Sequence, residues 1–436
     1  MKKRIGIGLS LGVLSLTAAL SLSSGSAQQT AAACNLKAPS SPVTINVFGF
    51  RFPMMEYYFK AAEACGKGNI SVRTSFLQPA QYETQVNTAL ATGTSPYQIL
   101  HVNPRLVAEW GNKGWLAPLN TLIAKYKKQY ALDDISDKLI ANTTLNGRQY
   151  ALPVNFNTQV QFYRKDIFAD LNIKPARNLE ELSSVLAALK KANKTRFPMA
   201  LALGGGGLAG EFHSNYAALG GVWFDANRKP IFNNANGVKA AQALRDWLEF
   251  MPPAVLNYTN DDVMVGLQQG DIALSKIWIT RAAAMEDEKV SRVVGKIDYA
   301  PAFKFVANGP GANTAEGDAL AIAASSKVDV DLVFRIMMEM LGKQNQSNAA
   351  NLGMVSRDSI ATNPSLVAKN RSWIAAAANA RQAVPLRPAV AYQGIANTIL
   401  GNELRLALAN KTDLKVALDT AAKKVEDEMR VQGFYR

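Results

Sequence analysis

Histidine and cysteine are nearly absent from this chain of 436 residues, which contains two of each. A metal centre built on histidine needs several clustered ligands, and the only histidines are His101 and His213, neither in a metal-binding motif. The single G-x-S-x-G pattern, at residues 8–12, lies in an apolar leader, and the glycines of residues 204–207 lack the G-K-[ST] of a phosphate loop. We therefore expect no cofactor, no metal and no enzymatic activity.

The N-terminus has the three-part pattern of a secretory signal peptide. A basic segment, Lys2-Lys3-Arg4, precedes an uncharged apolar stretch over residues 5–22, and small residues follow at 25–27. A single membrane anchor is the alternative, although glycine and serine interrupt the apolar run. We expect residues 1–27 to be a cleaved signal peptide, which places the protein in the periplasm or cell envelope.

The formal charge of +14 invites an interpretation as a nucleic-acid-binding protein. Lysine and arginine are, however, scattered among acidic residues, and no basic run with interleaved aromatics occurs. We attribute the charge to solvated surfaces and expect no nucleic-acid partner.

The two cysteines, Cys34 and Cys65, form a pair in a chain predicted to enter an oxidising compartment. Cys34 lies in a leader, residues 28–42, just before the first predicted strand, and Cys65 ends the helix that follows this strand. Both should lie at one edge of the first lobe, so we predict a disulfide. Two separate buried thiols, or lipidation of Cys34, are the alternatives.

Strand and helix patterns alternate along the chain. Residues 43–48, 70–76 and 97–102 read as strands, with helices from Pro53 and around Val86 between them. Asn146-Gly147 is a strong two-residue hairpin signal. Later strands are expected at 197–203, 272–279 and 318–323, and the last 90 residues or so are mainly helical. This alternation predicts an α/β fold with mostly parallel sheets.

Four stretches together resemble the family 1 extracellular solute-binding proteins, the sugar-binding components of ABC importers. They are Gly111-Asn112-Lys113-Gly114-Trp115-Leu116-Ala117-Pro118-Leu119, Asn146-Gly147-Arg148-Gln149-Tyr150-Ala151-Leu152-Pro153 with the following 161–168, Gly270-Asp271-Ile272-Ala273-Leu274 with Trp278, and Gly317-Asp318-Ala319-Leu320-Ala321-Ile322. Phe162-Tyr163-Arg164-Lys165-Asp166 and residues 291–297 and 432–435 are similar to its polyol-binding branch, although this branch usually has a tryptophan near Gly317.

This resemblance implies a two-lobed periplasmic-binding-protein fold with a ligand cleft between the lobes. The lobes would comprise residues 43–153 plus 302–345 and residues 156–298 plus 350–436, with hinge crossings near 152–156, 299–303 and 344–350. It also implies a carbohydrate or polyol ligand, the membrane permease of an ABC importer as partner, and a monomer.

Candidate ligand contacts lie in loops that follow strand ends, where the clefts of open α/β sheets form. They are Phe50, Arg51, Tyr82, Asn103, Asn155, Asn157, Glu211, His213, Trp278, Asp318 and Arg387. Trp278 is the expected stacking surface for the apolar face of a sugar, as the family resemblance also implies. Each has a structural alternative, such as core packing for Tyr82 and a turn for Asn103.

Two other functions fit the same sequence. A secreted carbohydrate-acting enzyme would need two carboxylates in a cleft, and no pattern selects such a pair. A binding protein for a non-sugar ligand such as an organic anion is slightly favoured by the positive charge.

Overall fold

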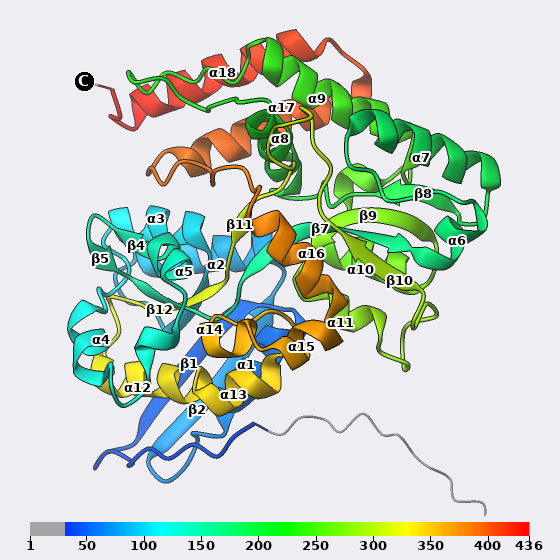
Figure 1. Cartoon of the computed structure of the whole chain (residues 1–436). Helices are drawn as coiled ribbons and strands as arrows, with labels where there is room; N and C mark the ends of the chain where they lie inside the picture. Colours follow the sequence, from blue (N-terminus) through cyan, green and yellow to red (C-terminus); the bar gives the residue numbers. More distant parts are fainter. Residues whose placement is uncertain (1–30, 436) are drawn as a thin grey trace, which may run out of the picture. The chain divides into compact units, whose positions relative to one another are not determined.

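The structure is a computed structural model that describes residues 31–435. The predicted signal peptide, residues 1–27, lies outside these residues. Two five-stranded sheets dominate the fold (Figure 1). The strands are β1 Val43–Phe50, β2 Ile70–Leu77, β3 Ile99–Val102, β4 Thr144–Leu145, β5 Arg148–Gln149, β6 Ala151–Pro153, β7 Asn157–Arg164, β8 Phe197–Ala200, β9 Ile272–Trp278, β10 Ile297–Ala300, β11 Ala315–Glu316 and β12 Ala319–Ile322.

The first sheet has the strand order β2-β1-β3-β12-β6 and forms the centre of lobe 1. β1 is parallel to β2 and β3, while β12 runs antiparallel to β3 and β6. Parallel strands need helical connections, which here are α1 and α2. The helices up to the second sheet are α1 Pro53–Glu63, α2 Pro79–Ala91, α3 Pro104–Asn112, α4 Asn120–Tyr126 and α5 Asp137–Asn142, with the 3₁₀ turn η1 Leu132–Asp134.

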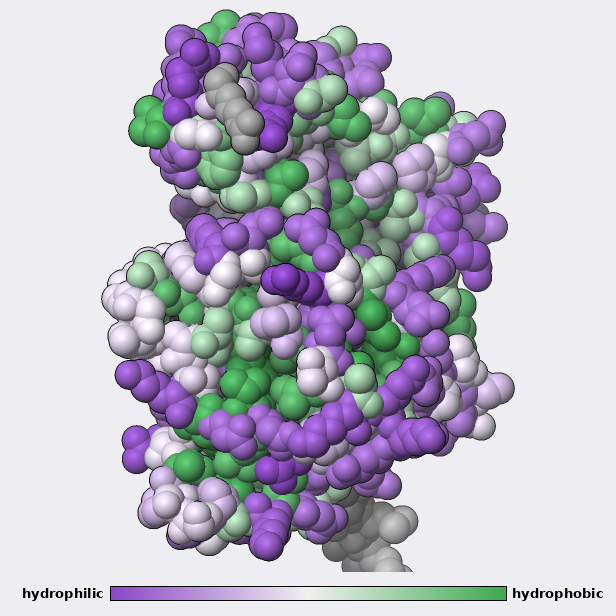
Figure 2. All heavy atoms as spheres, turned by 90° about the vertical axis from the view of Figure 1, so that its left-hand side faces the viewer, coloured by the Kyte–Doolittle hydropathy of each residue, from purple (hydrophilic) through white to green (hydrophobic). Residues whose placement is uncertain are grey.

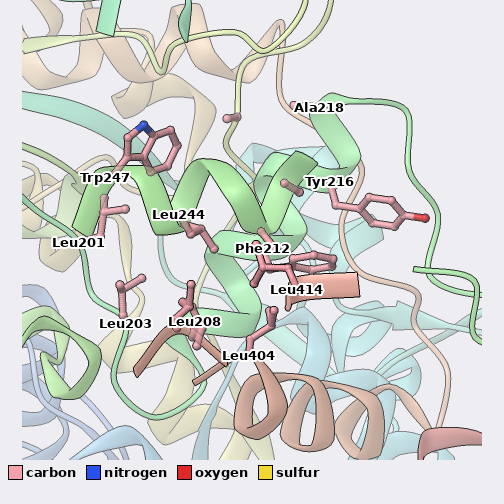
Figure 3. Packing of buried hydrophobic residues seen from close by; sticks show 14 of the residues in the cluster. Leu201, Leu203, Leu208, Phe212, Tyr216, Ala218, Leu244, Trp247, Leu404 and Leu414 are labelled. Atoms are coloured by element: carbon pink, nitrogen blue, oxygen red, sulfur yellow. The ribbon is translucent and has the colours of Figure 1, made fainter. Parts of the chain in front are cut away.

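The second sheet has the order β10-β7-β9-β8, with β11 paired to β7, and forms the centre of lobe 2. Leucine and aromatic side chains of α8, α9 and α17 make its larger core (Figure 3). The remaining helices are α6 Lys165–Asp170, α7 Leu179–Ala192, α8 Gly207–Ala218, α9 Ala235–Trp247, α10 Asn260–Gln268, α11 Ala282–Met285, α12 Val330–Met340, α13 Lys343–Ala349, α14 Asp358–Ala361, α15 Pro364–Lys369, α16 Arg371–Ala380, α17 Gln393–Asn410 and α18 Leu414–Val431, with the 3₁₀ turns η2 Leu248–Phe250, η3 Val255–Asn257 and η4 Ile279–Arg281.

Local sequence signals explain several element boundaries. Asn146 and Gly147 both adopt positive φ between β4 and β5, as a two-residue hairpin turn requires. Asn178 caps α7 by accepting a hydrogen bond from the Glu181 N–H at 2.9 Å. The predicted hairpin is confirmed.

The chain passes between the two sheets at the polar segment between β6 and β7, and again before β12. Phe303 and Ala312, which we had expected in lobe 1, pack in the core of lobe 2. The reason is that β11 pairs antiparallel with β7, so the chain stays on the second sheet until Gly317. Conversely, Trp373 is buried in the core of lobe 1. The exact residues that divide the lobes stay a prediction.

The predicted disulfide is present, with Cα atoms of Cys34 and Cys65 5.0 Å apart. Further hydrogen bonds hold the leader to lobe 1. The Ala32 N–H donates to Asn345 Oδ1 at 2.9 Å, and Asn69 Nδ2 donates to the Pro39 carbonyl at 3.0 Å. The leader is therefore attached to α13 and to the residue before β2.

Hydrophilic residues cover much of the face in Figure 2, with smaller hydrophobic areas between them. Among the described residues, no helix has the length and apolarity needed to cross a membrane.

Candidate ligand-binding site

The polar side chains that we expected at strand ends meet where the chain passes between the sheets. Asp318 lies directly before β12, Asn155 lies between β6 and β7, and Asn157 is the first residue of β7. The Asn155 side chain ties the two crossings together, because its Oδ1 accepts from the Asp318 N–H at 2.7 Å and its Nδ2 donates to Asp318 Oδ2 at 2.9 Å.

Asp318 is the centre of a buried hydrogen-bond network. His101, from β3, contacts Asp318 Oδ1 through Nε2 at 2.9 Å, and Asn157 Nδ2 donates to Oδ2 at 3.5 Å. Burial raises the pKa of Asp318, but the hydrogen bond and charge of His101, with the Asn155 amide and the Arg281 charge, outweigh it and lower the pKa. Asp318 is thus held as a carboxylate that only accepts hydrogen bonds.

Three buried polar atoms around this network have no hydrogen-bond partner among residues 31–435: His101 Nδ1, Asn157 Oδ1 and Arg281 Nε. Buried polar atoms in proteins are nearly always bonded, so unpaired ones need an explanation. An unpaired acceptor, Asn157 Oδ1, and an unpaired donor, Arg281 Nε, both lie around Asp318. A hydroxyl group can donate to the first and accept from the second, so this pair fits a hydroxyl-bearing ligand.

Trp278 ends β9, opposite Gln159 of β7. It is the only residue of β9 that is not fully buried, and its indole remains half-buried. The turn that follows places Arg281 with its guanidinium 5.4 Å from the Phe52 ring of lobe 1 and 3.3 Å from Asp261. Trp278 is thus a partly exposed aromatic residue at the end of β9, just before the turn that carries Arg281.

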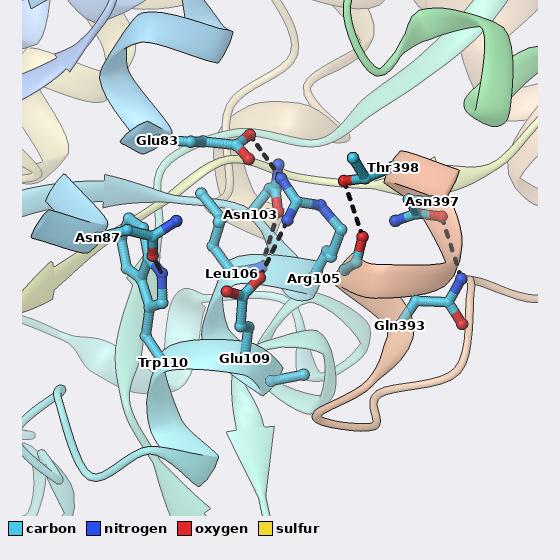
Figure 4. Close-up of polar contacts among 12 residues, drawn as sticks. Glu83, Asn87, Asn103, Arg105, Leu106, Glu109, Trp110, Gln393, Asn397 and Thr398 are labelled. Carbon is cyan, nitrogen blue, oxygen red and sulfur yellow. Dashed lines mark hydrogen bonds and ion pairs between the residues drawn. The ribbon is translucent and has the colours of Figure 1, made fainter. Parts of the chain in front are cut away.

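A pocket of about 130 Å³, partly open to solvent, adjoins the same crossing. Side chains from α3, α5, β11 and the loop before α17 line it, among them Arg105, Glu316 and Arg387. Figure 4 shows Arg105 of α3 between Glu83 and Glu109, with Gln393 and Asn397 of α17 nearby. Arg105 contacts Glu83 at 2.5 Å and Glu109 at 3.3 Å.

Glu316 and Arg387 also line this pocket. Burial raises the pKa of Glu316, and Asp318 adds to this effect against the opposing charge of Arg387. Burial, followed by the charge of Arg105, lowers the pKa of Arg387. Both groups lack the full solvation they would have in water, so a ligand that supplies hydroxyls would compensate them.

Glu211 lies in a second buried cluster instead. Its carboxylate pairs with Lys276 of β9 at 2.8 Å and accepts from Gln159 Nε2 at 2.6 Å. Lys276 also donates to the Ala312 carbonyl at 2.7 Å. These contacts join α8, β7 and β9 to the segment that precedes β11.

His213 is buried, and both ring nitrogens are occupied. Its Nδ1 accepts from Trp223 Nε1 at 2.8 Å, and its Nε2 donates to the Pro385 carbonyl at 2.9 Å. Burial and the charge of Arg387 lower the pKa of His213 to about 3, so the ring is neutral. It holds the loop that carries Arg387.

The other predicted residues have structural contacts of their own. Phe50 lies with its ring 3.9 Å from that of His101, and Tyr82 is fully buried with its hydroxyl donating to the His101 carbonyl at 2.6 Å. Asn103 caps α3 by accepting from the Leu106 N–H at 3.0 Å, while Arg51 is exposed and pairs with Glu56. The structural alternatives given above for Tyr82 and Asn103 describe their positions.

Sequence reasoning missed His101, Arg281 and Lys276. Lys276 stands alone as a charge in the apolar strand Ile272–Trp278, which is a signal for a buried ion pair. His101 and Arg281 follow no local pattern, since their partners come from distant segments. Among the described residues, no cluster of three histidine, cysteine or acidic side chains could hold a metal ion.

Comparisons with known proteins identify the family of the chain. Residues 54–333 match the model of the family described as bacterial extracellular solute-binding protein. The chain is 27% identical over 272 residues to the mannitol-binding protein of Pseudomonas aeruginosa, which covers 59% of each protein. It is 23% identical over 231 residues to the erythritol/L-threitol-binding protein of Mycolicibacterium smegmatis, covering 49% of this chain and 48% of that one. The chain thus matches about half to three fifths of the length of these relatives.

Solved structures share the fold over nearly the whole chain. An ABC transporter solute-binding protein of Agrobacterium radiobacter in complex with ribitol has a TM-score of 0.82 at 21% identity, covering 90% of this chain and 100% of that one. The Agrobacterium vitis protein with bound D-mannitol has a TM-score of 0.80 at 22% identity, covering 89% and 99%. Maltose-bound MalE3 of T. maritima has a TM-score of 0.78 at 21% identity, covering 88% and 99%. The fold is that of the two-lobed periplasmic binding proteins, and the chain belongs to the bacterial extracellular solute-binding protein family.

Proposed function

We propose that this protein captures a sugar or sugar alcohol outside the cytoplasmic membrane and delivers it, as a monomer, to the permease of an ABC importer. The observation that carries the proposal is the group of unpaired buried polar atoms at the crossing between the lobes, next to a half-buried tryptophan. Sugars and polyols offer hydroxyls to such atoms and C–H faces to an indole. The relatives named for mannitol and erythritol, and the ribitol and mannitol complexes, point to the same ligand class.

The site supports binding better than catalysis. The carboxylates nearest the crossing have fixed roles, because Asp318 accepts from His101 and two amides and Glu211 pairs with Lys276. Glycoside hydrolysis needs one carboxyl group as acid and a second as base or nucleophile across a bond. Capture followed by closure of the lobes is therefore the activity that we propose, with hinge motion at the crossings between the sheets.

Binding of an organic anion is a second candidate, because Arg387 lines the pocket and has no ion-pair partner within 4 Å in the described part of the chain, although the charge of Glu316 acts on it. The two classes are separable by thermal shift of the purified protein with D-mannitol, ribitol, erythritol, maltose and gluconate. A specific ligand raises the melting temperature with increasing concentration, because it binds only the folded state. Stabilisation by gluconate alone would favour the anion, and steady consumption of any compound would contradict a binding role.

A further inference from the structure

The two carboxylate oxygens of Asp318 have different hydrogen-bond partners. Its Oδ1 contacts His101 Nε2 at 2.9 Å, and its Oδ2 receives the Asn155 amide at 2.9 Å and the Asn157 amide at 3.5 Å. An ionised carboxylate can only accept, so both asparagines must turn their NH₂ groups toward it. Their carbonyl oxygens then point away from the Asp318 carboxylate.

The side-chain oxygens of the two asparagines differ in their hydrogen bonding. Asn155 Oδ1 is used by the Asp318 N–H at 2.7 Å. Asn157 Oδ1 is buried and unpaired, in a residue that is only 8% exposed. The network therefore leaves one fixed hydrogen-bond acceptor at the crossing.

His101 is built rigidly into this network. It is fully buried in β3, and its ring lies 3.9 Å from the Phe50 ring. A Cβ atom at Gly49 would come within 2.9 Å of His101 Cβ, so the neighbouring strand closes around it. The imidazole cannot swing aside, and Asp318 Oδ1 stays occupied.

We propose that His101 is a positioning residue for ligand recognition: through Asp318, it holds Asn157 Oδ1 as the acceptor of one ligand hydroxyl. This inference rests on the proposed function. Without the His101 donor, Asp318 Oδ1 is free to draw the Asn157 amide or the ligand hydroxyl to itself, and the acceptor loses its defined place. His101 thereby acts on specificity without touching the ligand.

The test is calorimetric titration of wild type, His101→Phe, His101→Gln and Asp318→Asn with D-mannitol and its 1-, 2- and 3-deoxy analogues, or ribitol and its deoxy analogues if only ribitol binds. In wild type, one deoxy analogue should bind about tenfold more weakly, because its missing hydroxyl leaves Asn157 Oδ1 unpaired. In His101→Phe this difference should shrink to near unity, and His101→Gln, which keeps a donor, should restore part of it. Asp318→Asn should behave like His101→Phe and serves if the latter does not fold.

Tyr57→Phe is the control, since it removes a buried hydrogen bond to Asn345 in the same lobe but outside the network. It should leave the ratios between analogues unchanged. If His101→Phe weakens the parent polyol and all analogues by one factor, or leaves every affinity unchanged, the positioning role is refuted while the proposed function stands. If wild type is stabilised by none of the sugars and polyols of the thermal-shift screen, the proposed function and this inference both fail.

Discussion

Trp278 keeps part of its indole exposed at the end of a strand whose other residues are all buried. A core tryptophan would be enclosed, as Trp110 and Trp223 are at 0% and 1% exposure. A side chain that stacks on a ligand must be partly exposed in the open site, so the exposure of Trp278 supports its proposed role as a ligand contact.

We predict that Trp278→Ala abolishes measurable polyol binding while lowering the melting temperature only slightly. The indole offers the ligand a large apolar surface, and Trp278 belongs to none of the four hydrophobic core clusters of the described residues, so its removal leaves those clusters intact. Calorimetry and thermal melts measure the two effects. Trp115→Ala is the matched control, since Trp115 is also half-buried but contacts Lys113. Normal binding by Trp278→Ala would place the anchor of the site elsewhere.

His213 gives a pH-dependent prediction. Its pKa is lowered to about 3 in the folded protein, against about 6.5 in an unfolded chain. A group with a depressed folded pKa is protonated first in the unfolded state, so stability falls as pH drops from about 6.5 toward 3. The slope from this one group approaches about 1.4 kcal/mol per pH unit.

The measurement is urea unfolding at several pH values between 7 and 4 for wild type and His213→Gln. The variant should be less stable at pH 7 but should lose less stability on acidification. Equal slopes for both proteins would contradict the buried neutral histidine.

The residues that sequence reasoning found and those it missed differ in a physical way. Asp318, Asn155 and Asn157 stand next to strand ends, and strand ends can be read from alternation and turn residues. His101 lies inside β3, and Arg281 in a short turn, and only the pairing of distant strands brings them to the same place. Tyr82 was proposed as a ligand contact but is fully buried, because helical periodicity alone cannot distinguish a core face from a face that lines a cleft.

At the scale of elements, most strands and helices could be predicted because their signals are local. The strand predicted from residue 43 ends at Phe50 rather than Phe48, and the helix predicted from Pro53 ends at Glu63. The division between lobes was harder, since β11 is only two residues long and its pairing with β7 depends on tertiary structure. Short pairing segments carry almost no pattern of their own.

The Cys34–Cys65 disulfide gives the prediction for this scale. It closes a loop with a sequence separation of 31 residues, which should stabilise the folded state by about 3–4 kcal/mol in the loop-entropy estimate. Cys34→Ser combined with Cys65→Ser should lower the free energy of unfolding by about that amount. Denaturant titration measures it, and wild type with reductant gives an independent check.

Ligand affinity should not change in this double variant at temperatures where it is folded. The leader contacts Asn345 and Asn69 of lobe 1, and none of the proposed ligand contacts is among its partners. A large loss of affinity would mean that the leader supports the site, contrary to this view.

At the scale of the whole molecule, side chains of the two lobes contact each other. Gln78 of lobe 1 donates to Asp261 of lobe 2 at 3.1 Å, and Arg281 lies over Phe52. On another side, α17 approaches α3, where a Cβ atom added to Gly394 would lie 3.1 Å from Glu109 Oε2. The missing side chain of Gly394 therefore permits a close approach between helices of the two lobes.

Gly394→Leu should consequently weaken ligand binding without destabilising the protein. Leucine favours helix over glycine by roughly 0.5–1 kcal/mol, so α17 itself should gain stability. Its bulk would meet Glu109 and keep α3 and α17 apart, which opposes the closure that traps a ligand. We expect an affinity loss of about tenfold and, by small-angle X-ray scattering, less compaction on addition of polyol than in wild type. Asn402→Leu, at an exposed position of the same helix, should bind and compact normally. Full compaction of Gly394→Leu with unchanged affinity would mean that the lobes close without bringing these two helices together.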